Sequence, residues 1–338
     1  MSQPLIFITG ATGFIGSHVV SQALEADYRV RLSVRKESQA SKLKELFAKH
    51  TAKLDFVIIP DLAKPGAFNQ ALLGTDFVFH IASPMPGTGN DFKSDYLAPA
   101  EQGTITLLDA AKSISTIKRI VIVSSILALV PLDVWVTGNF NVKEGSNPSI
   151  PIDRDMEFPQ DPKASAGLKY QASKILAHRS VLEWAPKNKP GFTIVTLNPS
   201  FVFGRNLNQT SEDGIDGTNA MLWESLFSEK PTFPMVAVDV RDVALAHLRA
   251  LDVDFKGQTA VQEFVLSAPD PVRSDWERVV EFVREKYPQL NIQLKGPFEN
   301  PSKAEANRAT ELLGIQWRRM EDTIASFLDH QLELKAQL

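Results

Sequence analysis

A tyrosine and a lysine stand four residues apart, the spacing that places two side chains on one face of a helix. Tyr170 and Lys174 form this Tyr-x-x-x-Lys pair, and the chain's three other tyrosines have no lysine at that spacing. A free phenol has a pKa of about 10, and an ammonium group one turn away favours the phenolate and lowers that pKa. The pair therefore predicts a general acid that donates a proton near neutral pH. Such pairs also arise by chance, so the pair alone does not identify a site.

A serine that could assist this acid follows a candidate buried strand. The run 119–123 is apolar after its first residue and ends in Ser124 and Ser125. Hydroxyls at the carboxyl end of a parallel strand face the crevice where ligands bind. We expect Ser125 to bind a substrate carbonyl and hold it for Tyr170, with Ser124 on the cofactor side. A lone strand-end serine is more often structural, so the prediction depends on chain order: a glycine-rich turn, then the serine, then the Tyr-x-x-x-Lys pair.

The glycine-rich turn lies between the apolar run 5–8 and a helix predicted from Phe14 to about Asp27. Its spacing is Gly-x-x-Gly-x-x-Gly, in which glycine permits a tight turn and leaves backbone amides open to a pyrophosphate. The helix N-terminus adds free N–H groups and the positive end of its dipole. This strand–turn–helix context favours a dinucleotide site over a purely structural turn. The residues expected to bind the cofactor here are Gly10, Thr12, Gly13, Phe14, Ile15 and Gly16.

The end of the next predicted strand, 29–34, bears on which dinucleotide is bound. NAD sites usually place an acidic residue at this position, whereas here Arg35 and Lys36 follow the strand. A guanidinium group can fork onto a 2′-phosphate, and Lys42 in the following helix is placed to assist. The alternative is a solvated basic turn with no ligand. The position favours NADP(H) as the cofactor.

The elements that must position these residues alternate between apolar strands and helical stretches. This alternation predicts a parallel sheet covered on both faces. The expected fold class is α/β, a Rossmann-type doubly wound parallel sheet with a smaller α/β C-terminal substrate lobe. We expect residues 1–198 to form the NADP-binding domain, with 236–251 returning to it. Residues 199–338 then form the lobe, with a loop over 206–217 and a strand near 263–266. The strands predicted for the sheet are 5–8, 29–34, 54–59, 77–81, 119–124 and 192–197.

Composition narrows the function classes. The 338 residues are 43% hydrophobic and carry a net charge of −4, which gives no electrostatic reason to expect nucleic acid or an anionic membrane. No stretch approaches the roughly 20 apolar residues of a membrane span. The absence of cysteine excludes disulfides and thiolate catalysis, and the six histidines lack metal-ligand spacing. We expect a cytoplasmic protein without a metal, as a monomer or homodimer, whose partner is a small molecule.

Together these residues resemble the short-chain dehydrogenase/reductase family in its extended branch, over nearly the whole chain. The pattern is most similar to dihydroflavonol reductases, cinnamoyl-CoA reductases and yeast-type methylglyoxal or ketone reductases. Further motifs that carry the resemblance are Asp61-Leu62, His80–Pro84, Gly103-Thr104, Asn198–Ser200, Phe201–Gly204 and Val240–His247. We interpret His80 itself as a structural strand-end histidine. The resemblance implies that Asp61 and Leu62 contact the adenine, Ala82 and Ser83 line the ribose and nicotinamide side, Pro199 and Val202 contact the carboxamide, and Lys174 also holds the ribose hydroxyls.

The sequence departs from the family pattern in two places. Thr106 stands where many relatives carry an asparagine, so no proton relay beyond Lys174 is assigned. The segment between the catalytic serine and tyrosine is long, and we expect residues 132–160, including 134–136 and 138–139, to cover the substrate mouth. The side chains expected to shape the substrate pocket with it are Met85, Leu127, Val130 and Phe203.

The leading hypothesis is an NADPH-dependent carbonyl reductase, acting reversibly as an alcohol dehydrogenase. Hydride from the cofactor would attack an aldehyde or ketone while Tyr170 protonates the oxygen. One alternative is a nucleotide-sugar epimerase or dehydratase, which usually keeps NAD, so Arg35 argues against it. Another is a regulatory protein that senses NADP without turnover, against which the intact Ser125, Tyr170 and Lys174 argue.

Overall fold

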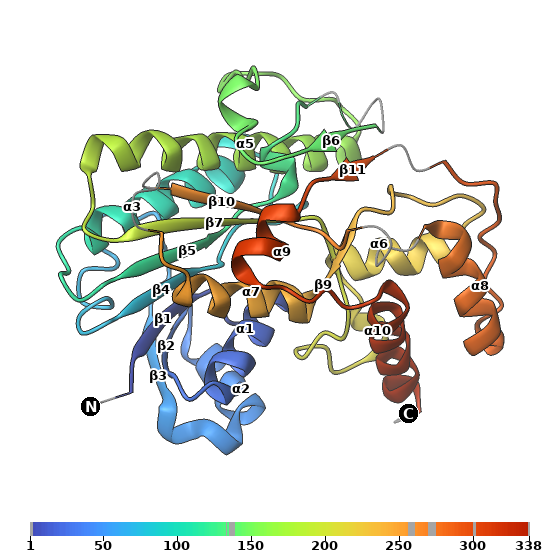
Figure 1. Cartoon of the computed structure of the whole chain (residues 1–338), viewed down its shortest axis with the longest axis horizontal. Helices are drawn as coiled ribbons and strands as arrows, with labels where there is room; N and C mark the ends of the chain where they lie inside the picture. Colours follow the sequence, from blue (N-terminus) through green and yellow to red (C-terminus); the bar gives the residue numbers. More distant parts are fainter. Residues whose placement is uncertain are drawn as a thin grey trace.

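The computed structural model describes residues 3–132, 134, 139–255, 261–269, 275–299 and 302–336. A seven-stranded sheet, parallel throughout, forms its centre, in the order β10-β7-β5-β4-β1-β2-β3 (Figure 1). The order changes direction between β1 and β4, so the carboxyl ends of these two strands open the crevice in which ligands of such sheets bind. The predicted Rossmann-type fold is confirmed. The strands are β1 (Leu5–Thr9), β2 (Arg29–Val34), β3 (Leu54–Ile58), β4 (Phe77–His80), β5 (Arg119–Val123), β7 (Thr193–Pro199) and β10 (Val261–Leu266).

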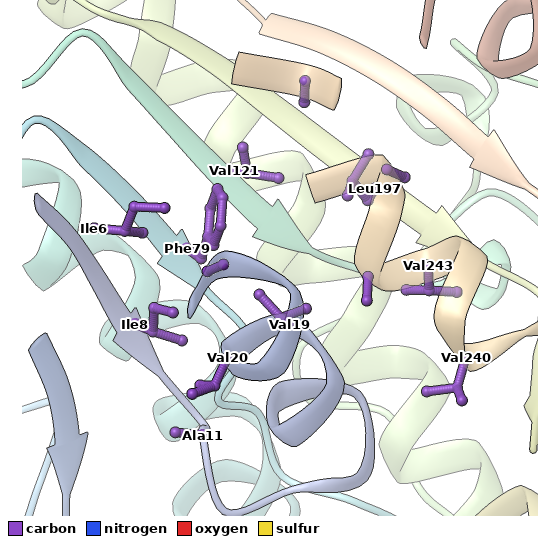
Figure 2. Close-up of a cluster of buried hydrophobic side chains, with 14 of the residues drawn as sticks. Ile6, Ile8, Ala11, Val19, Val20, Phe79, Val121, Leu197, Val240 and Val243 are labelled. Atoms are coloured by element: carbon purple, nitrogen blue, oxygen red, sulfur yellow. The ribbon is translucent and has the colours of Figure 1, made fainter. Parts of the chain in front are cut away.

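Helices cover both faces of the sheet (Figure 1). On one face, Val19 and Val20 of α1 and Val240 and Val243 of α7 pack over strand residues such as Phe79 (Figure 2). On the other face, α3 and α5 pack over the same strands. This double cover explains why the strand sequences are almost uninterrupted apolar runs. The helices are α1 (Phe14–Glu25), α2 (Glu37–Leu46) and α7 (Val240–Asp252) on the first face, and α3 (Gly103–Ala111) and α5 (Pro162–Asn188) on the second.

The helix that carries the predicted acid has well-defined ends. Asp161 precedes α5, and its carboxylate accepts a hydrogen bond from the backbone N–H of Ala164 at 2.8 Å. Pro162 occupies the first turn, where its missing N–H costs nothing. The helix ends at Lys189, which adopts a left-handed conformation with φ of 46°. The 27 residues of α5 therefore form one continuous support beneath β5 and β7.

The C-terminal part of the chain forms a second hydrophobic core. Phe203, Phe233 and Trp276 pack at its centre, and Figure 1 shows its helices beside the carboxyl end of the sheet. The elements here are β8 (Phe201–Phe203), β9 (Ala237–Asp239), α6 (Gly217–Leu226), α8 (Trp276–Lys286) and α10 (Met320–Lys335).

One strand expected in this lobe belongs to the main sheet. The predicted strand near 263–266 is β10, which pairs with β7 at the sheet edge. The chain thus returns to the sheet twice, through α7 and through β10, and α9 (Asn307–Leu313) packs against both. The sequence pattern near 263–266 indicates a strand but not the strand that it pairs with, because strand pairing depends on contacts between residues far apart in the sequence. The division of the chain near residue 198 remains our proposal, with residues 261–266 moved to the first domain.

Short elements complete the described chain. A second small sheet joins β6 (Asn141–Val142) to β11 (Lys303–Ala304). A π-helix precedes α3. No described helix is both long and apolar enough to cross a membrane. The π-helix is η2 (Phe92–Gln102), and the 3₁₀ helices are η1 (Ala48–Lys53), η3 (Ile126–Ala128), η4 (Asn147–Ser149), η5 (Glu212–Gly214) and η6 (Pro288–Leu290).

Candidate active site

The glycine-rich turn connects β1 to α1 as predicted, and each of its glycines has a steric reason. Gly10 has φ of 76°, and a Cβ there would lie 2.6 Å from the backbone nitrogen of Ala82. A Cβ on Gly16 would lie 2.0 Å from the carbonyl oxygen of Gly10. Gly13 closes the turn, donating its N–H to the same oxygen at 3.0 Å. The turn is therefore tight, the form that lets a pyrophosphate approach backbone amides.

The turn is joined to the end of β4 through the side chain of Thr9. Its Oγ1 accepts the N–H groups of Ile81 and Ala82, both at 3.1 Å, and hydrogen-bonds Nδ1 of His80 at 2.9 Å. Burial lowers the pKa of His80 to about 4, with Lys174 acting in the same direction. The imidazole is thus neutral at physiological pH. This agrees with the interpretation of His80 as a structural residue at the sheet's crevice.

A pocket of about 220 Å³ opens beside the turn. Thr12, Gly13 and Phe14 line one side, and residues of the 206–217 loop line the other. Asn208 from this loop donates to the carbonyl oxygen of Gly13 at 3.1 Å. The loop contacts that sequence reasoning missed are Asn206 and Asn208. Their positions depend on how a segment nearly 200 residues away folds back, although the loop's Asn, Asp and Gly content gave a signal for a pocket.

Arg35 lies directly after β2, as the sequence predicted, with its side chain exposed. Its backbone N–H donates to Oε1 of Gln39 at 2.8 Å, and α2 begins two residues later at Glu37. Lys42 is exposed on α2. Arg35 therefore lies just before a helix N-terminus, where backbone N–H groups and the helix dipole also favour an anion.

Ser125, Tyr170 and Lys174 meet at the carboxyl end of β5. Ser125 caps η3, and its Oγ accepts the backbone N–H of Leu127 at 3.1 Å. Its hydroxyl also hydrogen-bonds the phenol of Tyr170. Nζ of Lys174 lies 5.6 Å from the centroid of the Tyr170 ring. The three residue types needed for carbonyl chemistry thus come together from β5 and α5.

The pKa of the tyrosine differs from the sequence-based expectation. Burial raises the pKa of Tyr170 to about 12, and the hydrogen bond with Ser125 acts weakly in the opposite direction. Burial also lowers the pKa of Lys174 to about 8. The prediction of a lowered phenol pKa was wrong for this environment, because desolvation of the phenolate outweighs the opposing effect of the hydrogen bond with Ser125. The phenol therefore keeps its proton at neutral pH, the state that a proton donor needs.

The remaining predicted cofactor residues lie around the crevice with different exposure. Asp61 is exposed and accepts the N–H of Ala63 at 2.9 Å, and Leu62 is half-buried next to Gly103. Pro199 and Val202 are buried at the end of β7 and in β8. The hydroxyl of Ser124 lies 3.2 Å from Nδ1 of His178. It is thus engaged with the interior of the protein, and its place among the cofactor contacts stays a prediction.

The four predicted pocket residues separate into two groups. Met85 is half-exposed and Leu127 is half-buried, so both remain candidates for contact with a substrate. Val130 is buried in a cluster with Val142 and Val265. Phe203 is fully buried in the core of the C-terminal lobe. Val130 and Phe203 thus pack in hydrophobic cores. The sequence pattern of a short apolar run cannot show whether a residue packs in a core or lines a pocket.

An apolar cluster surrounds Tyr170. Phe92 packs on Phe158 with 4.9 Å between ring centroids. Leu132, Ile152, Met156 and Phe158 of the predicted 132–160 segment therefore lie in the same cluster as Tyr170, while Trp135, Val136 and Gly138 fall outside the described residues. The position of this segment over a substrate mouth stays a prediction. Among the described residues, no three His, Asp or Glu side chains gather to hold a metal ion. The partly buried members of the cluster are Leu132, Ile152, Met156, Phe158 and Tyr170.

The family follows from comparison with known proteins. Residues 6–262 match the NAD dependent epimerase/dehydratase family. The chain belongs to this family. The predicted membership of the extended short-chain dehydrogenase/reductases is confirmed.

Several relatives of the chain are described as reductases. The ketoreductase sphI of Aspergillus fumigatus is 35% identical over 340 aligned positions, covering 98% of this chain and 99% of the relative. A putative NADPH-dependent methylglyoxal reductase of Candida albicans, GRP2, is 29% identical, covering 97% and 99%. The crystal structure of the yeast methylglyoxal/isovaleraldehyde reductase Gre2 complexed with NADPH superposes with a TM-score of 0.82 at 25% identity, covering 99% and 100%.

Proposed function

We propose that the chain is an NADP(H)-dependent carbonyl reductase that reduces an aldehyde or ketone to an alcohol, and that it also catalyses the reverse oxidation. The observation that carries the proposal is the meeting of Ser125, Tyr170 and Lys174 beside the glycine-rich turn. The relatives described as ketoreductases and as an NADPH-dependent methylglyoxal reductase support the same activity. The Gre2 structure with NADPH supports the cofactor.

Each residue has a separate task. NADPH, when bound, supplies the hydride for the carbonyl carbon. Because Ser125 accepts from Leu127, its own proton is left for an acceptor such as the substrate oxygen. Tyr170 then gives its proton to the developing alkoxide, and the raised pKa means that the proton is present at neutral pH. Lys174 keeps a positive charge next to the phenol below a pH of about 8. The apolar cluster around Tyr170 fits an apolar carbonyl substrate.

The carbonyl proposal is tested by the consumption of NADPH with a panel of aldehydes and ketones. The wild-type protein is expected to oxidise NADPH with at least one carbonyl. Tyr170→Phe is expected to lower kcat by about 100- to 10,000-fold, the usual contribution of a positioned acid, while NADPH binding stays unchanged. Tyr28→Phe, which removes a phenol on the opposite face of the sheet, serves as the matched control. Turnover with no carbonyl, or full activity in Tyr170→Phe, would contradict the proposal.

The cofactor proposal is tested at Arg35. Losing a charge-assisted hydrogen bond to a 2′-phosphate costs about 1.5–3 kcal/mol. We expect Arg35→Ala to reduce the preference for NADPH over NADH by about 10- to 100-fold, mainly in KM for NADPH. Arg29→Ala removes an exposed arginine at the other end of the same strand and should leave the preference unchanged. An unchanged preference in Arg35→Ala would exclude the guanidinium as the phosphate contact. A nucleotide-sugar epimerase would instead favour NAD and act without net consumption of cofactor.

A further inference from the structure

A small cavity of about 20 Å³ lies between the loop after β4 and α5. Ala82 and Ser83 line one side, and Lys174 and His178 line the other. Ser124, at the end of β5, contributes to the wall between them. The cavity therefore adjoins the catalytic lysine and extends into the interior of the protein.

Two buried polar atoms in the cavity wall have no hydrogen-bond partner in the described part of the chain. These are Nε2 of His80 and Oγ1 of Thr196, whose residues are 2% and 1% exposed. A buried polar atom without a partner is costly, and ordered water commonly satisfies it. A cavity needs about 10–15 Å³ and two to four polar partners to hold one water molecule. This cavity has the volume, the two unpartnered atoms and the ammonium group of Lys174.

A chain of hydrogen bonds leads from the same cavity to the edge of the sheet. Oγ of Ser124 lies 3.2 Å from Nδ1 of His178, and Nε2 of His178 lies 2.8 Å from Oε1 of Glu263. The His178 side chain is fully buried, whereas that of Glu263 is 15% exposed. Glu263 belongs to β10, the edge strand. The chain thus joins the interior beside Lys174 to a carboxylate that reaches solvent.

We propose that the cavity holds one water molecule that hydrogen-bonds Lys174 and Ser124, and that Ser124, His178 and Glu263 carry protons between solvent and the Tyr170–Lys174 pair. This proposal rests on the proposed reductase function. The proposed chain supplies a proton relay for Lys174, although Thr106 stands where many relatives carry an asparagine. The side chain of Thr106 is bonded elsewhere, to the carbonyl oxygen of Ala63 at 3.4 Å and to Gln102 at 3.3 Å.

The proton balance during reduction is simple. The Tyr170–Lys174 pair loses one proton to the alkoxide and regains one from the water. The water takes a proton from the Ser124 hydroxyl, and Ser124 takes one from Nδ1 of His178. His178 takes a proton at Nε2 from the Glu263 carboxyl group, which is protonated from solvent. One O–H or N–H bond forms for each that breaks, and one proton enters from solvent for each alcohol formed. Oxidation of an alcohol runs the same steps in reverse.

Other charged groups face this chain and set its environment. Lys174 and the neutral His80 share the cavity with His178. At the sheet edge, Glu263 lies near Glu144, whose pKa is raised by burial and by the Glu263 charge. Arg308 of α9 bonds the backbone oxygen of Glu263. Glu144 is therefore a matched control: it is a second partly buried acid on this edge, and it binds the N–H of Val265 outside the chain.

The kinetic test distinguishes a role in reprotonating Tyr170 from a role in positioning the active-site residues. Glu263→Gln and His178→Gln each break the chain with little change in volume. We expect both to leave the rate of the first turnover and KM for the carbonyl unchanged, since Tyr170 begins protonated. Steady-state kcat is expected to fall about tenfold or more, with a larger solvent deuterium isotope effect than in the wild type. Glu144→Gln should match the wild type in all four quantities.

Two results would overturn the relay. Wild-type kcat and isotope effect in both variants would exclude proton transfer along this chain, and an equal fall of first-turnover and steady-state rates would assign the residues a structural role. A crystal structure tests the water independently of any activity. Density for a water within hydrogen-bond distance of Nζ of Lys174 and Oγ of Ser124 is expected, and a dry cavity would exclude it. An active enzyme with a dry cavity refutes only the relay, whereas an ordered water in a protein without carbonyl turnover refutes the reductase function and the relay that rests on it.

Discussion

Two segments at the carboxyl end of the same sheet are held in place by different means. The turn after β1 is shaped by close approaches of backbone, since a Cβ on Gly16 would meet the carbonyl oxygen of Gly10 and a Cβ on Gly10 would meet the backbone of Ala82. The segment after β5, residues 126–131, depends on side chains from elsewhere. Val130 packs against Val265 of β10, and Gln171 of α5 donates to the carbonyl oxygens of Val130 and Pro131, both at 3.0 Å.

This difference shows which part of the site a local sequence can specify. A turn that depends on missing side chains has its signature in consecutive residues. A segment that depends on long-range packing has no such signature. The cofactor side should therefore be intolerant of a single added methyl group. The substrate side should tolerate substitutions at exposed positions. Substitution of the buried residues that hold it in place should lower both stability and activity.

The largest effect is expected from Gly16→Ala. The new Cβ would lie 2.0 Å from the carbonyl oxygen of Gly10, so the turn must open. Backbone amides that we expect to contact the pyrophosphate would then move away, and each lost charge-assisted hydrogen bond costs about 1.5–3 kcal/mol. We expect NADPH affinity, measured by fluorescence titration, to fall at least about 100-fold. Gly191→Ala is the control, because nothing lies within 4 Å of a Cβ there. Equal NADPH binding by the two variants would refute the steric account of the turn.

Gln171→Ala tests the other side of the comparison. The Gln171 side chain is fully buried, and its amide donates to the carbonyl oxygens of Val130 and Pro131, at the end of the segment that follows Ser125. Leaving a buried acceptor without its donor costs about 1–3 kcal/mol. We expect the free energy of unfolding in urea to fall by about that amount. We also expect kcat/KM for the carbonyl to fall more than NADPH affinity does. Gln70→Ala, at an exposed position away from the site, should change neither quantity. Equal losses in carbonyl and NADPH affinity would mean that the two sides are not independently supported.

Much of the fold followed from the sequence because its signals are local. The six predicted strands are all present, since strands buried on both faces read as apolar runs. The meeting of Ser125, Tyr170 and Lys174 could be predicted because Ser125 follows a strand and the other two residues share one face of a helix. The position of β10 could not, because the six residues Val261–Leu266 do not indicate which strand they pair with. His178 and Glu263 likewise lie 85 residues apart and carry no motif.

The pKa of Tyr170 shows a second limit. Sequence supplied the neighbouring ammonium group but not the depth of burial, and burial decides the direction of the shift. Val130 and Phe203 show the same limit, because an apolar residue near a site packs into the core or faces the substrate depending on tertiary contacts. Residue type and spacing therefore predicted which groups meet. They did not predict how deeply those groups are buried.

Lys174 lies between the two sides, and its titration couples them. Burial lowers its pKa to about 8, so the ammonium charge is present below that pH and is lost above it. We expect kcat/KM for carbonyl reduction to be level below a pH of about 8 and to fall about tenfold per pH unit above it. Lys174→Arg, whose guanidinium keeps its charge, should have a lower rate but no such alkaline fall. An alkaline fall with the same midpoint in Lys174→Arg would assign the titration to another group.

The smallest effect is expected from Met85→Ala, which probes the exposed part of the substrate side. Met85 is 48% exposed, on a loop whose residue Gly87 donates its N–H to the Tyr96 hydroxyl at 2.9 Å. Because little packing is lost, the free energy of unfolding should change by no more than about 0.5 kcal/mol. If Met85 contacts the substrate, KM for bulky apolar carbonyls should rise several-fold, in line with the roughly 1–3 kcal/mol at stake in one apolar pocket contact. KM for the smallest aldehydes and NADPH affinity should stay constant. Leu312→Ala on α9, at a similarly exposed leucine, should leave every KM unchanged. A uniform change across all carbonyls would place Met85 outside the pocket and leave the cluster around Tyr170 to set substrate choice.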